Sequence, residues 1–141
     1  MTMQPVRALP IDAAEWWIVY LRGALVDRPE SYATGVKFYS KVPNPRPARF
    51  VVIRRDGGSV TGVFDRPRVA IDVWHDPGSA MGEKHATDLA NLLTALAFDA
   101  PGTNGCTRVE HLSGPNDVAD PSGQPRRLSL IEATHRVAVL T

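Results

Sequence analysis

The sequence predicts an α+β fold in which two main α-helices pack on a mainly antiparallel or mixed β-sheet of about four to five strands. Three observations predict it. Two β-type segments joined through glycines occupy residues 43–74, an amphipathic helical pattern follows at 79–98, and an alternating pattern closes the sequence at 126–140. The expected order is helix, short strand, two strands, helix and two strands.

The first helix is expected from residue 13 onward. Asp12 precedes the segment AAEWWIVYLRGALVD, and Glu15 follows at the spacing of a capping box. The helix is apolar on nearly all sides, because Trp16 and Val19 lie off the stripe that contains Trp17. One side is expected to meet the sheet. For the other side two interpretations stay open: it contacts a neighbouring subunit, or the Trp pair wraps the edge of the domain.

Two long segments have loop chemistry. Residues 28–47 begin with Arg28-Pro29 and are rich in proline, with a short strand expected at 36–40. Residues 113–125 combine glycine, proline, asparagine and aspartate, and deletion of 116–123 is expected to leave the fold intact. Long loops of this kind in a compact domain are usually functional or mobile, so both are expected to contact another protein.

The hairpin at 43–74 is expected to be the rigid centre of the fold. Residues 50–53 are a β-branched and aromatic run, and Val69, Ile71 and Val73 alternate with other residues, which places them on one buried face. The glycines at 57–58 are interpreted as the turn between the two strands, with a second flexible joint at 61–62.

The remaining elements follow from periodicity. Leu89 and Leu93 belong to the apolar stripe of the second helix, at 79–98. A short strand is expected at 107–112. In the final strand, 126–140, Ile131 and Ala133 share one face with His135.

Length and composition predict one domain, residues 1–141. The hydrophobic fraction is 43%, enough for a core, and the net charge of 16 − 15 = +1 gives no electrostatic argument for a membrane or a specific nucleic-acid partner. The N-terminus has no secretion signal, and no apolar segment approaches the length of a bilayer span. We therefore expect a soluble protein made in a cytoplasm.

The histidines do not form a usual metal-binding pattern. A zinc site needs three or four converging ligands, and the spacing of the four histidines matches none of the known patterns. His75 and His85 are interpreted as surface or helix-start residues, and His135 as a satisfied core histidine.

The other reactive groups also have structural interpretations. Cys106 has no nucleophile signature and is expected to be buried or half-buried. Asp65, Asp72 and Asp76 are interpreted as solvated charges at the sheet edge. Two arginine doublets are expected to pair with acidic groups on another subunit or to aid solubility: Arg54-Arg55 and Arg126-Arg127.

Motifs for phosphate cradles, dinucleotide sites and serine nucleophiles are absent from the sequence. We therefore expect no catalytic, cofactor-binding or metal-ligating residues. The expected role is structural or binding, and not that of an enzyme.

The succession of four blocks resembles the tail terminator (tail completion) proteins of long-tailed bacteriophages. The blocks are VPNPRPARFVVIRRDGG at 42–58, DRPRVAIDVW at 65–74, the helical HATDLANLL, and TRVEHLSGPNDVADPSGQPRRLSLIEATHRV at 107–137. Their order and spacing, more than any single block, carry the resemblance across nearly the whole chain.

The resemblance implies a virion protein, a small α+β subunit that forms a hexameric ring at the head-proximal end of the tail tube. Such a ring stops tube polymerisation and gives the filled head a surface for joining. The implied partners are further copies of the chain, the tail tube protein and a head-completion or connector protein. The family has no active site, so no residue role is transferred.

Three alternatives stay open. One is another neck component, such as a head-completion or connector subunit. Another is a small metal-dependent bacterial enzyme that uses His75, His85 and Asp76. The third is a nucleic-acid-binding accessory protein, against which the near-neutral charge argues.

Overall fold

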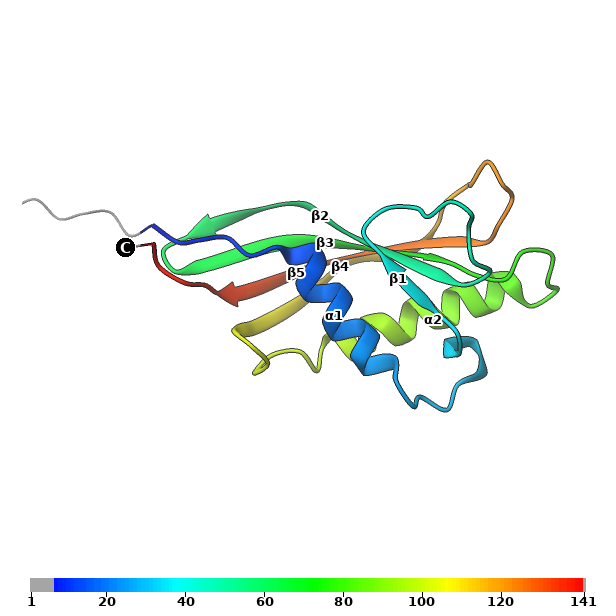
Figure 1. Cartoon of the computed structure of the whole chain (residues 1–141), viewed down its shortest axis with the longest axis horizontal. Coiled ribbons are helices and arrows are strands. Elements are labelled where there is room, and N and C mark those ends of the chain that lie inside the picture. Colours follow the sequence, from blue (N-terminus) through cyan, green and yellow to red (C-terminus); the bar gives the residue numbers. More distant parts are fainter. Residues whose placement is uncertain (1–6, 141) are drawn as a thin grey trace, which may run out of the picture.

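A computed structural model describes residues 7–140 of the chain. The α+β expectation is confirmed: both main helices lie on the same side of one mixed five-stranded sheet (Figure 1). The elements in chain order are α1 (Ala13–Leu25), the 3₁₀ helix η1 (Ser31–Ala33), β1 (Lys37–Tyr39), β2 (Phe50–Thr61), β3 (Phe64–Trp74), α2 (Gly82–Ala97), β4 (Cys106–Asp117) and β5 (Arg126–Arg136).

The sheet has the strand order β1-β2-β3-β5-β4. β1 runs parallel to β2, and the other neighbours are antiparallel. β1 pairs only with residues 50–52 of β2, so within residues 7–140 the rest of that edge of β2 has no neighbouring strand. The central strand β3 is paired along both edges.

The main core lies between the sheet and the two helices. Alternate residues of β2, β3 and β5 point to this side, as their period-2 pattern predicts. Ile71 and Ile131 are fully buried there, as are Trp17 of α1 and Leu89 and Leu93 of α2. Asp12 caps α1, since its carboxylate accepts a hydrogen bond from the Glu15 amide at 3.1 Å.

A smaller cluster covers the other face of the sheet at one end. The Phe50 and Trp74 rings stack there, with centroids 4.7 Å apart and planes at 9°. The guanidinium of Arg126 lies 4.6 Å from the Trp74 ring, a cation–π contact. Val52 is also fully buried on this side, so β2 and β3 have buried residues on both faces at this end.

The predicted turn at 57–58 is wrong. Both glycines lie inside β2, where the register with β3 shifts between Arg55 and Gly58, and the hairpin turns at 62–63. Glycine at positive φ occurs both in some bulges and in some tight turns, so glycine alone does not distinguish them. Gly58 has φ +106°, and a Cβ there would lie 2.2 Å from the carbonyl oxygen of Arg66.

The ends of the last two strands also differ from expectation. β4 continues through the Gly114-Pro115 pair to Asp117, because an edge strand with register shifts tolerates both residues. The loop is therefore 118–125, and residues 116–117 pair with β5, so deletion of 116–123 would remove sheet pairing. β5 ends at Arg136, and residues 137–140 pair instead with the N-terminal segment through the bridge between Ala8 and Val139.

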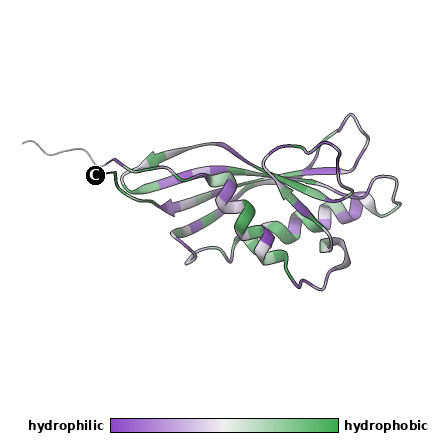
Figure 2. Cartoon of the chain, in the orientation of Figure 1, coloured by the Kyte–Doolittle hydropathy of each residue, from purple (hydrophilic) through white to green (hydrophobic). Residues whose placement is uncertain are grey.

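The sheet extends beyond both helices at the end where the β2–β3 hairpin turns (Figure 1). The segments 7–9 and 137–140 lie at this same end, held by hydrogen bonds from the Leu9 amide to Ala138 and from the Val137 amide to Val63. Figure 2 shows hydrophobic residues both at this end and along α1. Within residues 7–140, no helix has the length and apolar character required to span a membrane.

Replacing Ile71 with aspartate is expected to unfold the protein. Ile71 is fully buried against the helices, and a carboxylate there would lose its hydration without gaining a hydrogen-bond or ion-pair partner. We expect the free energy of unfolding, measured by urea denaturation, to fall by about 4 kcal/mol or more. The control Leu112→Asp, on an edge-strand side chain that is 42% exposed, should change it by less than about 1 kcal/mol. A wild-type midpoint for Ile71→Asp would contradict the register of β3.

Candidate interaction surface

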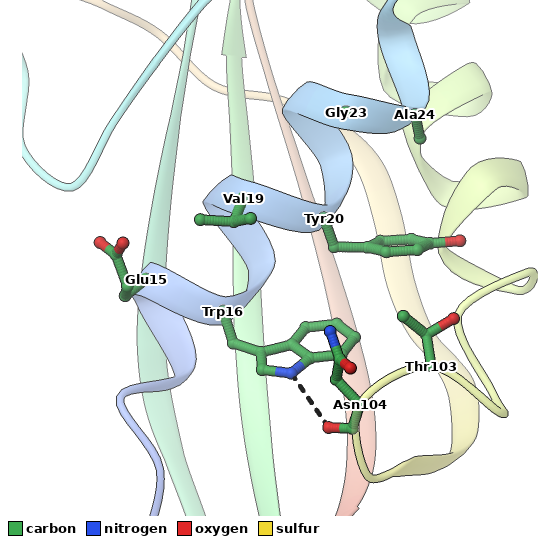
Figure 3. Close-up of a pocket in the computed structure, with 8 residues that line it drawn as sticks. All are labelled: Glu15, Trp16, Val19, Tyr20, Gly23, Ala24, Thr103 and Asn104. Carbon is green, nitrogen blue, oxygen red and sulfur yellow. Dashed lines mark hydrogen bonds between the residues drawn. The ribbon is translucent and has the colours of Figure 1, made fainter.

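The outer side of α1 carries an apolar hollow, which is the strongest candidate for a functional surface. Its volume is about 640 Å³. The helix contributes one wall, and the loop between α2 and β4 contributes the other (Figure 3). The lining residues are Glu15, Trp16, Val19, Tyr20, Gly23, Ala24, Thr103 and Asn104.

Two aromatic rings form the floor of the hollow. Trp16 and Tyr20 stack, with centroids 5.5 Å apart; the Trp16 ring points toward Asn104, and the Tyr20 hydroxyl points toward α2 (Figure 3). The indole N–H of Trp16 donates to the Asn104 carbonyl oxygen at 3.4 Å, and the Tyr20 hydroxyl donates to the Leu96 carbonyl oxygen at 3.1 Å. Both polar tips are therefore satisfied within the subunit, and the parts of both rings that line the hollow present apolar surface to solvent.

The two tryptophans of α1 have different environments. Trp17 is fully buried, and its indole N–H donates to Nε2 of His135 at 3.2 Å. Trp16 is half-buried at the hollow, while Val19 is exposed beside it. The expectation that α1 has a second apolar side is confirmed.

The sequence could predict only half of this hollow. The apolar side of α1 was visible as Trp16 and Val19 at helical spacing. Thr103 and Asn104 carried no signal, because a turn-rich loop far along the chain gives no indication of which helix it will approach.

The two segments expected to be free contact arms are joined to each other. The Arg46 guanidinium contacts the Asp120 carboxylate at 2.8 Å, and the Trp74 indole N–H donates to it at 3.2 Å. Gln124 donates to the carbonyl oxygens of Ala48 and His75. Residues 43–48 and 118–125 are thus fastened over the same end of the sheet.

Hydrogen bonds keep the Asp120 carboxylate, at the centre of the junction between residues 43–48 and 118–125, ionised. The Ser122 hydroxyl donates to Asp120, and together with Trp74 and Arg46 it holds the pKa of the Asp120 carboxyl far below its usual value. The carboxylate is therefore ionised at any physiological pH, and the contact with Arg46 stays charged on both sides.

The interpretation of three aspartates as solvated edge charges is wrong. Asp65 and Asp72 are fully buried, and Asp76 is half-buried. Each carboxylate accepts hydrogen bonds from two guanidinium nitrogens of one arginine, at N···O distances of 2.7 to 2.9 Å. The pairs are Arg55 with Asp65, Arg126 with Asp72 and Arg49 with Asp76. A buried carboxylate requires such a partner, because its desolvation is otherwise too costly.

The surroundings of Asp65 show how the pairing works. Burial alone would raise the pKa of Asp65, but the hydrogen bonds from Arg55 and from the Ile11 amide lower it overall. The Arg49 guanidinium likewise lowers the pKa of Asp76. These carboxylates are therefore structural anions.

The arginine doublets serve the subunit itself, so their expected pairing with another subunit is corrected. Arg54 contacts Asp72 at 3.2 Å, in addition to the pairs that Arg55 and Arg126 make. Arg127 contacts Glu83 of α2 at 2.6 Å and Asp117 of β4 at 3.1 Å. Alternation placed these residues correctly along the strands but could not show which acids lie across from them.

The histidines are placed partly as expected. His135 is a core histidine, as predicted, but His75 is fully buried, which corrects its surface interpretation. The Nε2 of His75 donates to the Tyr32 carbonyl oxygen at 3.0 Å, and His85 packs beside it at the start of α2, with ring centroids 5.5 Å apart. Between residues 7 and 140, no three His, Cys, Asp or Glu side chains are grouped so that they could hold a metal ion.

Cys106 is buried, as expected. Burial raises the pKa of its thiol, so the nucleophilic thiolate is disfavoured at neutral pH. The thiol belongs to the main core, and its weak hydrogen bond goes to the carbonyl oxygen of Arg108.

Acidification is expected to weaken the fold through His135. Burial lowers the pKa of His135 to about 4, against 6.5 in an unfolded chain, despite the nearby Asp65 carboxylate; the Arg55 guanidinium also disfavours the proton. The unfolded chain therefore binds a proton that the folded chain excludes, so stability is full above about pH 6.5 and is lost toward pH 4. At pH 5 the loss from His135 is about 2 kcal/mol, and His75 adds to it because burial lowers its pKa too.

Urea denaturation at pH 7.5 and pH 5 measures this effect. His135→Gln removes the titrating ring and should reduce the pH dependence, whereas the control His111→Gln, at an exposed position, should leave it unchanged. Equal pH dependence in wild type and His135→Gln would show that the buried ring is not the source.

Asp120→Ala is expected to release the junction between the two loops. It removes the acceptor of the Trp74 indole N–H and the partner of Arg46, on a side chain that is only 3% exposed. We expect the free energy of unfolding to fall by about 2 kcal/mol and amide hydrogen exchange at 118–125 to accelerate. Asp117→Ala is the matched control: its carboxylate also pairs with an arginine, Arg127, but is 76% exposed, so the change should stay below about 1 kcal/mol.

Comparison with known proteins does not assign a family to this chain. A scan against protein-family models finds no match, and a search of curated proteins finds none either. The features that bear on function are therefore the sequence blocks, the apolar hollow on α1, and the buried aspartates that arginines of the same subunit hold.

Proposed function

We propose that this protein is a structural subunit of a long-tailed bacteriophage virion, a tail terminator. In this role several copies, six by the resemblance, form a ring at the head-proximal end of the tail tube. The ring stops tube polymerisation and offers the surface to which the filled head joins. Its partners are further copies of the chain, the tail tube protein and a head-completion or connector protein.

The succession of sequence blocks supports this proposal together with the fold. The blocks at 42–58, 65–74 and 107–137 fall on β2, β3, β4 and β5, and HATDLANLL falls on α2. All four blocks therefore belong to the sheet and to the helix that covers it. A resemblance spread over a whole fold indicates shared architecture more strongly than one confined to a loop.

The observation that carries the proposal is the uncovered apolar side of α1. A helix with one apolar side in the core and an aromatic hollow on the other is suited to contact between proteins. Aromatic side chains dominate the centres of protein interfaces, and Trp16 and Tyr20 supply two of them.

The positions of the reactive groups favour assembly over chemistry. His75, His135 and Cys106 are buried within the fold, and Asp65 and Asp72 are held by arginines. The metal-enzyme alternative depended on His75, His85 and Asp76. The His75 ring is buried against the Tyr32 carbonyl, and Asp76 is occupied by Arg49, so no observation favours that alternative.

Tail tubes assembled in vitro test the proposal. Adding the purified protein to polymerising tube subunits should yield tubes of limited length with one end capped, measured by electron microscopy. Val19 lines the hollow and is 49% exposed, so Val19→Glu should fold normally but cap poorly. Met81→Glu, 47% exposed at the start of α2, is the matched control and should cap like wild type.

Unchanged tube length and unchanged head joining in the presence of the wild-type protein would overturn the proposal. Binding to portal or connector rings without binding to tubes would instead assign the chain to another position in the neck. Pull-down with each purified partner separates these two outcomes.

A further inference from the structure

The chain carries an exposed apolar tip at the end of the sheet remote from α2. We define the tip as residues 7–9, 60–64 and 136–140, which the Ala8–Val139 bridge and the hydrogen bond from the Val137 amide to Val63 hold together. Four of its large apolar side chains are 42% to 55% exposed: Leu9, Val60, Val139 and Leu140. Such a concentration of exposed apolar groups on a small subunit indicates a contact surface.

The tip and the hollow carry opposite charges. The tip contains Arg7 and Arg136, and Arg66 lies just beyond it. Within residues 7–140, none of these three arginines takes part in an ion pair. At the hollow, Glu15 lines the wall and is also outside these pairs. Asp99 stands near the Tyr20 hydroxyl, whose pKa is raised by burial and by this carboxylate.

The remaining charges near α1 do not disturb this match. Arg22 lies one turn beyond Val19 and lines a different hollow, between the end of α1 and β1. Most other arginines of the described chain are already paired with acids of the subunit. The tip is therefore apolar with a basic rim, and the α1 hollow is apolar with an acidic rim.

We propose that the tip of one copy of this chain seats in the α1 hollow of a second copy. The tip cannot reach the hollow of its own subunit, because β2, β3 and β5 carry it outward past α1 as continuous strands (Figure 1). The contact joins two different patches, so it is heterologous: it closes into a ring if the rotation per subunit is right. Its role in a tail rests on the proposed function, whereas the contact itself does not.

The hollow has the size for this occupant. A volume of about 640 Å³ falls in the range of pockets that enclose a drug-sized ligand, which suffices for several aliphatic side chains. The aromatic floor of Trp16 and Tyr20 offers apolar ring surface to such side chains, while Arg136 or Arg66 of the incoming tip would lie beside Glu15 at the rim.

Cysteine cross-linking between two variants tests the contact. One protein carries Val19→Cys at the hollow, and the other carries Val60→Cys at the tip; both positions are exposed. Mild oxidation of the mixture should give a disulfide-linked dimer on a non-reducing gel, whereas each variant alone should give far less. Native Cys106 does not compete, because it is buried. A mixture of Val19→Cys with Met81→Cys is the matched control, since Met81 is equally exposed and lies off both surfaces.

Charge reversal provides the second readout. Glu15→Arg in the Val19→Cys protein should slow cross-linking about two- to five-fold, the range of an exposed ion pair. Arg136→Glu in the Val60→Cys protein should do the same, and the two together should recover part of the rate. Unchanged rates in both variants would overturn the proposal, because the charge match assigns the tip to this hollow.

The outcome also separates this inference from the tail-terminator function. No cross-link above the control up to about 1 mM protein, where even a weak contact is half occupied, overturns the inference. If such a protein still caps tail tubes, the proposed function stands without this contact. If the cross-link forms but tube length and head joining are unaffected, the contact is real and the proposed function fails.

Discussion

The burial of β3 on both of its faces is the constraint on which the rest of the structure depends. From Val69 to Trp74 every residue of this strand is buried. One face is covered by α1 and α2, and the other is closed at its end by the fastened loops and the stacked Phe50 and Trp74 rings. A strand covered in this way must supply a partner for each polar side chain it carries.

That constraint explains where the charges of the chain are used. Asp65 and Asp72 lie on β3 and face opposite sides of the sheet, and each holds an arginine from a neighbouring strand. These pairs fix the register of β2, β3 and β5, since shifting a strand by one residue would turn its charges onto the wrong face. The charges that β3 buries thus have their partners within the subunit, while apolar groups remain exposed at the α1 hollow and at the tip.

The sequence predicts the features that depend on the local periodicity of apolar residues. It fails for features that depend on which distant segment packs against an element. The helical stripe of α2 and the alternation of Val69, Ile71 and Val73 were enough to place both elements and the main core. Alternation also put Asp72 on the face away from the helices, but it could not show that Arg126 and the loops would cover that face. The sequence cannot separate the bulge at Gly58 from a turn, because a glycine at positive φ suits either feature. The hollow was half visible, as the outer side of α1, and its second wall comes from a loop distant in sequence.

Two adjacent residues of α1 have different roles: Trp17 stabilises the core, and Trp16 lines the surface hollow. Consecutive helical positions are about 100° apart, so one indole can enter the core while the next lies at the surface. Trp17 is fully buried against His135, and the fold depends on it directly. Trp16 rests half-buried on Tyr20, and its loss would alter the hollow more than the core. The core residues are buried within the single chain, and the Trp16 and Tyr20 rings of the hollow are already in place there. In the proposed contact with a second copy, α1 would need little reorganisation, and a preformed surface loses less entropy on binding.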